Sequence, residues 1–257
     1  MKKLLILLWG VSISVNATND NPPSFTANYT SQPVLIDGLG NEKTWQEAPW
    51  YAIDKIILGE QLNPQDFSGR FQLLWNEQYL YIHAEIQDDV LIDKYASPID
   101  RYWDDDCLEI FIDEDDSGGD HLYNFNAFAY HVGLDNQVAD IGIHPYTKKP
   151  IAMLFNDHIK SVWKRQEVPP YKISWELAIK VFDDSFQVDA PAQSVHLKAD
   201  KILGFMLAYC DNDGSENREH FIGSSNITPI NGDKNLGYKT ADVFEKLILI
   251  KRVNNEN

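Results

Sequence analysis

The stretch CLEIFID, residues 107–113, places Leu108, Ile110 and Ile112 at every second position. A period of two is typical of a β-strand that turns one face toward an apolar core. Similar alternation recurs along the chain at residues 80–87, 122–130, 172–181, 203–210 and 243–250. This repeated pattern, with one apolar and one mixed face, indicates antiparallel sheets packed on a core.

A hairpin and the scarcity of helical patterns complete the prediction of the fold class. Residues 71–75 and 79–86 are strand-like segments on either side of the turn-like residues 76–78. Helical patterns are confined to one or two turns at 41–48 and a second candidate at 192–200. Many short strands separated by turns are typical of a sandwich. We therefore predict an all-β, antiparallel β-sandwich, jelly-roll-like, with one or two short helices.

The chain of 257 residues contains no obvious linker or repeat, so we expect one domain at 33–252. Residues 1–17 combine a basic start, an apolar run and small residues before a cleavage point after Ala17, which is typical of a secretory signal peptide. Residues 18–32 are predicted to be a polar leader and 253–257 a tail. We expect a secreted or periplasmic protein without membrane insertion.

The chain is strongly acidic, with 22 Lys and Arg against 39 Asp and Glu and a formal net charge of −17. Such a surface repels phosphate backbones and anionic headgroups, which argues against nucleic acid and membrane surfaces as partners. Neutral sugars and divalent cations remain compatible with it. Cys107 and Cys210 could pair as a disulfide or serve as small buried apolar residues, and the sequence leaves both interpretations open.

The most informative candidate site is the segment from Tyr102 to Asp113, in which an aromatic and three acidic residues precede the strand. Sugars present apolar CH faces and hydroxyl rims, so a sugar site needs a flat aromatic ring and groups that accept hydroxyl protons. Trp103 and Glu109 supply that combination, together with Asn124 and Asn126, which we expect on the next strand. The alternative is that Trp103 covers the core and the acidic residues form a solvated turn.

Several segments in order resemble carbohydrate-binding module family 9. The resemblance covers about 33–252 and rests on VLIDG at 34–38 with WQEA at 45–48, LWNEQYLYI at 74–82 with Asp88, the segment from Trp103 to Asp113, GF at 204–205 with DND at 211–213, and the closing strand before Lys251. It implies a β-sandwich, often calcium-bound, that binds sugar chain ends between two tryptophans.

Within the resemblance, Trp103 matches the first stacking tryptophan and Glu109 the acid that binds hydroxyls. Asn126 falls near a position where sugar-binding members carry arginine. The second tryptophan is matched by Gly223, so this chain departs from the pattern there. Phe221 or the loop residue Tyr146 could supply the missing aromatic ring.

Calcium is a possible cofactor, because acidic groups suited to Ca²⁺ occur at 88–89, 93, 104–106, 113–116 and 211–214. Each group alone could equally be a solvated turn, and no ligand set is assigned. A related sandwich fold carries haem in some periplasmic proteins, but haem is not expected here.

The prediction is therefore a secreted, non-catalytic protein that binds oligosaccharide or polysaccharide ends in a context of carbohydrate breakdown. An enzyme is less favoured, because the sequence contains neither a G-x-S-x-G motif nor a P-loop and the family is a binding module commonly attached to hydrolases. The alternatives are an envelope interaction or structural protein with a degenerate sugar site, and a haem-binding periplasmic domain. Protein partners are not predicted.

Overall fold

The computed structural model describes residues 24–191 and 193–251, so the expected signal peptide at 1–17 and the tail at 253–257 lie outside the described residues. Fourteen strands and two short 3₁₀ helices follow one another in the described part. In chain order they are β1 (Phe25–Tyr29), η1 (Lys43–Glu47), β2 (Tyr51–Ile53), β3 (Lys55–Leu58), β4 (Phe67–Trp75), β5 (Leu80–Asp88), β6 (Cys107–Asp113), β7 (Phe128–Gly133), β8 (Val138–Ile143), β9 (Pro150–Leu154), β10 (Ile159–Arg165), β11 (Lys172–Ile179), β12 (Ile202–Asp211), β13 (His220–Gly223), η2 (Ala241–Val243) and β14 (Glu245–Ile250).

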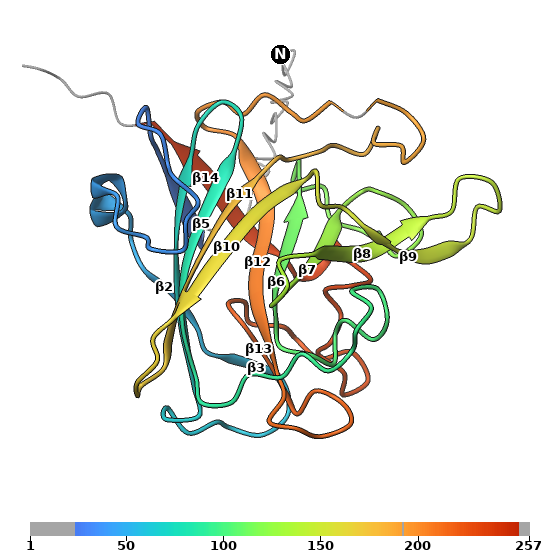
Figure 1. Cartoon of the computed structure of the whole chain (residues 1–257). Coiled ribbons are helices and arrows are strands. Elements are labelled where there is room, and N and C mark those ends of the chain that lie inside the picture. The colour runs from blue at the N-terminus through green and yellow to red at the C-terminus, as the bar shows by residue number, and fades with distance from the viewer. Residues whose placement is uncertain (1–23, 192, 252–257) are drawn as a thin grey trace, which may run out of the picture.

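The strands join into one sheet in the order β10-β11-β5-β4-β1-β14-β12-β6-β7-β8-β9, while β2 pairs with β4, and β13 pairs with β12 and β3. The sheet curls until the half that contains β4 and β5 faces the half that contains β12 and β6, with β1 and β14 between them (Figure 1). β1 runs parallel to both β14 and β4, whereas the other strand pairs of the described residues are antiparallel.

The main core lies between the two halves of the curled sheet. Phe67 of β4 stacks on Tyr209 of β12 with ring centroids 5.3 Å apart. Leu108, Ile110 and Ile112 of β6 are buried in this core, as their alternation predicts. The remaining β6 side chains face the other way, because successive residues of a strand point to opposite faces of a sheet. The predicted β-sandwich is confirmed. Glu109 lies on the face of β6 that points away from the main core, so its side chain is available for a binding site.

Three local expectations differ from the structure. The segment 18–32, expected to be a polar leader, contains β1, because Phe25 and Ala27 are buried and Phe25 packs on Phe205 at 5.7 Å between ring centroids. Asn124 and Asn126 lie in the loop before β7, which begins only at Phe128. Residues 193–200 contain no helix. In residues 24–191 and 193–251, no helix has the length and hydropathy needed to cross a membrane.

Candidate functional site

A cavity of about 380 Å³ opens on the face of the sheet opposite the main core. Glu109 of β6 and His131 of β7 line it from the strands, and Trp103 lines it from the segment before β6. Arg218, in the loop between β12 and β13, and Tyr238, in the loop before η2, line it as well. These five residues come from four separate segments of the chain, which the fold brings to one cavity.

Glu109 is the most heavily engaged carboxylate of the cavity. Its Oε1 accepts hydrogen bonds from His131 Nε2 at 2.6 Å, Arg218 Nη1 at 3.0 Å and Cys210 Sγ at 3.1 Å. Burial alone raises the pKa of Glu109, but the contacts with His131, Arg218 and Cys210 more than offset this effect and lower the pKa below its ordinary value. All three contacts converge on Oε1, and within the described residues none is made to Oε2. An ionised oxygen is thus left to accept a ligand hydroxyl.

Arg218 owes its position to several contacts. Its guanidinium lies 4.2 Å above the centroid of the Phe221 ring, and its Nη1 is 2.9 Å from Cys210 Sγ. Phe221 is 1% exposed, so it supports Arg218 from beneath and is absent from the cavity lining. Cys210 lies opposite Cys107 in the β6–β12 pairing, and both cysteines are free and buried.

The predicted site residues separate into two groups. Trp103, 41% exposed, and Glu109 line the same cavity. Asn126 lies elsewhere: its Nδ2 donates to Gly118 O at 2.7 Å, and it lines a separate hollow with Asn124 and Asp184. Tyr146, at the tip of the β8–β9 hairpin, is 90% exposed and also outside the cavity.

Gly223 cannot be replaced by a large side chain in this fold. A Cβ atom built on it would lie 2.7 Å from Cδ1 of Ile57, which occupies the space a tryptophan would need. Besides Trp103, two tyrosines line the cavity: Tyr102, which is buried, and Tyr238, which is half-buried. Tyr238 sits in an irregular loop with no periodic pattern around it, so no sequence signal identified it. His131 and Arg218 were likewise missed, because only strand pairing and loop packing bring them to Glu109.

Two overlapping acidic groups lie away from the cavity. One carboxylate oxygen each of Asp88, Asp211 and Asp213 lies within 4.8 Å of the others, and the same holds for Asp66, Asp89 and Asp213. Asp88 and Asp211 are buried, and burial raises the pKa of each to about 7. Carboxylate oxygens are the ligands that Ca²⁺ prefers, so this donor set fits a calcium ion.

Comparison with known proteins gives concordant results. The family described as "Carbohydrate family 9 binding domain-like" matches residues 36–252. Endo-1,4-beta-xylanase C of Paenibacillus barcinonensis is 23% identical over 219 residues, which are 84% of this chain but only 16% of that enzyme. The chain therefore spans about one sixth of the curated relative it matches.

Solved structures share the fold at low sequence identity. A carbohydrate binding module family 9 from Caldicellulosiruptor kristjanssonii in complex with cellotriose has a TM-score of 0.63 and 19% identity, covering 91% of this chain and 96% of its own. The complex of a family 9 module from the same organism with glucose gives 0.62 and 20%, with 90% and 99% covered. A putative carbohydrate-binding protein from Bacteroides uniformis gives 0.56 and 14%, with 88% and 98% covered.

Proposed function

Because this chain belongs to the carbohydrate family 9 binding domain-like family, we propose that it binds the end of an oligosaccharide or polysaccharide, without catalysis, in the cavity lined by Trp103 and Glu109. The observation that carries the proposal is the meeting of an exposed indole and a buried, ionised carboxylate in one cavity. The indole offers a flat apolar surface to the CH face of a sugar, and the carboxylate accepts hydrogen bonds from its hydroxyls.

The size and lining of the cavity suit one or two sugar units. Its volume of about 380 Å³ lies near the lower end of the usual range for small-molecule sites, roughly 300–1,000 Å³. Asn217 and Asn235 add amide donors and acceptors to the lining, and Tyr102 and Tyr238 add further aromatic rings. Glucose and cellotriose, held by the solved relatives, are the first ligands to test, and xylotriose follows from the xylanase relative.

The test is titration calorimetry with these three sugars on the wild type and on Trp103→Ala. We expect wild-type binding and a roughly twofold to tenfold loss of affinity in the variant, since an aromatic contact contributes roughly 0.5–1.5 kcal/mol. The matched control is Trp50→Ala, because Trp50 is also partly exposed and lies against Arg70, away from the cavity. Unchanged affinity in Trp103→Ala would overturn the stacking role. No binding of any sugar by a folded wild type would favour an interaction protein with a lost sugar site, which the packing of Ile57 against Gly223 would explain.

Two further proposals concern the setting of this activity. The composition of residues 1–17 supports secretion or export to a periplasm, and the relative's name supports a role in carbohydrate breakdown. Calcium is proposed to bind at Asp88, Asp211 and Asp213, where it would offset the repulsion among three carboxylates and stiffen the loops that bear them.

A further inference from the structure

More than half of the residues that line the cavity belong to no helix or strand. Asn217 and Arg218 lie in the loop 212–219 between β12 and β13, and Asp104 faces them from the loop 89–106 between β5 and β6. Loops without strand pairing depend on side-chain contacts for a defined position. The contacts between these two loops therefore decide where Asn217 and Arg218 stand.

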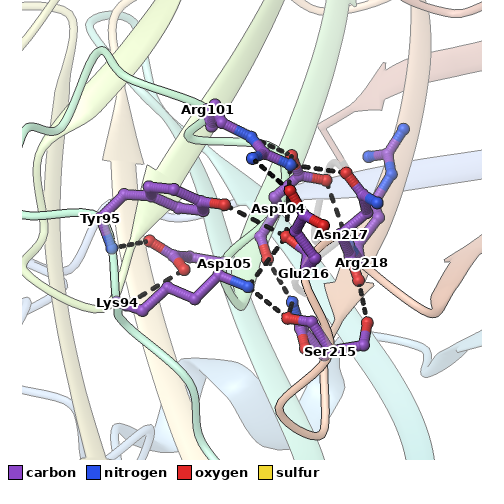
Figure 2. A network of polar contacts seen from close by, with 10 residues as sticks. Lys94, Tyr95, Arg101, Asp104, Asp105, Ser215, Glu216, Asn217 and Arg218 are labelled. Carbon is purple, nitrogen blue, oxygen red and sulfur yellow. Dashed lines mark hydrogen bonds and ion pairs between the residues drawn. The ribbon is translucent and has the colours of Figure 1, made fainter.

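Arg101 contacts residues of both loops (Figure 2). Its Nε donates to Asp104 Oδ2 at 2.9 Å, and its Nη2 donates to Asn217 Oδ1 at 2.5 Å and to the Glu216 carbonyl at 3.2 Å. One side chain thus joins both loops. Asp104 extends the link, because its Oδ1 accepts from the Arg218 backbone N at 3.1 Å.

Two further residues of the loop 89–106 donate hydrogen bonds to the Glu216 carbonyl. That oxygen also accepts from Lys94 Nζ at 2.9 Å and from the Tyr95 hydroxyl at 3.1 Å (Figure 2). Arg101 also stands 4.9 Å from the centroid of the Tyr95 ring. Three donors from one loop hold a single carbonyl of the other, immediately before Asn217.

Two features separate Arg101 from an ordinary surface arginine. Its φ of 52° lies in the left-handed region, which a non-glycine residue adopts only where the surroundings hold it. Its partner Asp104 has a side chain only 5% exposed, whereas the Glu216 carboxylate, 3.7 Å from Arg101 Nη1, is 84% exposed. Exposed ion pairs contribute little, so the contacts with Asp104, the Glu216 carbonyl and Asn217 are the ones that matter.

We propose that Arg101 is a positioning residue that stands outside the cavity and holds Asn217 and Arg218 in place for the ligand. The consequence for sugar affinity rests on the proposed function. Arginine suits this role because its planar fork serves several acceptors at once, whereas a lysine ammonium is a single point of charge. Arg101 itself is absent from the cavity lining, so a change at this position acts through the loop 212–219.

The experiment combines hydrogen exchange with titration calorimetry on Arg101→Gln and Arg101→Lys. Arg101→Gln should bind the sugar about tenfold more weakly and exchange faster at 212–219, with the strands of the core unchanged. Arg101→Lys should fall between wild type and Arg101→Gln, because it keeps the charge beside Asp104 but loses the fork. Arg70→Gln is the matched control, since Arg70 pairs with Glu85 at 2.6 Å and lies over Trp50, away from both loops.

A double-mutant cycle with Asn217→Ala separates positioning from general destabilisation. If Arg101 acts through Asn217, Arg101→Gln should reduce the sugar affinity less in the Asn217→Ala variant than in the wild type. Wild-type exchange at 212–219 together with wild-type affinity in Arg101→Gln would overturn the proposal. Absence of sugar binding by the wild type would remove the proposed function alone, because faster exchange confined to 212–219 would still support the holding role of Arg101.

Discussion

The carboxylate of Glu109 and the imidazole of His131 meet at 2.6 Å because the two residues are direct partners in the β6–β7 pairing. The other ring nitrogen of His131 lies 3.0 Å from the Ala129 carbonyl. Both ring nitrogens of His131 therefore face an oxygen atom of the protein. The floor of the cavity is held by rigid strands before any ligand arrives, which lowers the entropy cost of binding.

Glu109→Gln is expected to reduce both stability and sugar affinity. The substitution leaves Arg218 as a buried cation without its counter-charge, and breaking a buried pair in this way costs roughly 3–5 kcal/mol. Urea unfolding and calorimetry measure the two effects. Glu85→Gln is the control, because Glu85 forms a partly exposed pair with Arg70 and should change stability by less than about 1 kcal/mol. Equal effects of the two substitutions would contradict the role assigned to Glu109.

Tyr238→Ala should weaken sugar binding by roughly fivefold to tenfold, since the ring contributes about 1 kcal/mol of aromatic contact. Tyr238→Phe should retain most of the affinity if the ring face makes the contact. Tyr123→Ala is a suitable control, because Tyr123 is 67% exposed and does not line the cavity. Ligand titration followed by tryptophan fluorescence gives the three affinities. A loss in Tyr238→Phe as large as that in Tyr238→Ala would assign the contact to the hydroxyl instead.

Gly223→Ala should destabilise the fold by about 1 kcal/mol or more, because its Cβ would meet Ile57 Cδ1 at 2.7 Å. Ile57→Val deletes that Cδ1 atom, so the double variant should regain part of the loss. Urea unfolding of the two single variants and the double variant measures this coupling. Strictly additive effects would show that another contact limits position 223.

Acid should destabilise the protein partly through His158. Burial, with a smaller contribution from Lys180, lowers the pKa of His158 to about 3. The unfolded chain takes up a proton below the ordinary histidine value near 6.5 while the folded chain does not, so stability is lost as pH falls from about 6.5 toward 3. Protonation of His158 in the unfolded chain should account for about 2.5 kcal/mol of the stability lost between pH 7 and pH 4.5.

His158→Asn should therefore show a smaller loss of stability between these two pH values than the wild type. Asn keeps a polar group near the Tyr130 hydroxyl, which lies 2.7 Å from His158 Nδ1. The exposed His196→Asn serves as the control. Urea unfolding at both pH values measures the difference, and an identical pH effect in His158→Asn and wild type would contradict this origin.

Calcium removal should lower the unfolding temperature if Asp88, Asp211 and Asp213 hold the ion. Scanning calorimetry with calcium and after chelation measures how much bound calcium raises the unfolding temperature. This rise increases with the calcium concentration by mass action. Asp213→Asn should abolish most of the calcium-dependent rise in unfolding temperature. Asp233→Asn should leave this rise unchanged, because Asp233 is an exposed residue in another loop. A rise that survives Asp213→Asn would place the ion elsewhere.

The strands and the sandwich could be predicted because alternation is a local property that each segment carries by itself. β6 shows this most clearly: Leu108, Ile110 and Ile112 reach the core, and Glu109 points to the opposite face. Trp103 and Glu109 were found together for the same reason, since they lie six positions apart in one segment.

The rest of the site was decided by tertiary structure. Arg218 contacts Glu109 although the two residues are 109 positions apart in the sequence. Tyr238 lines the cavity from a loop whose residues show no hydrophobic periodicity. Asn126 and Phe221 were predicted to line the site. Asn126 instead lines a separate hollow, and Phe221 lies beneath Arg218. Contacts between residues distant in sequence are fixed by strand register and by hydrogen bonds between loops. The local sequence pattern of one segment does not indicate which other segment it will contact.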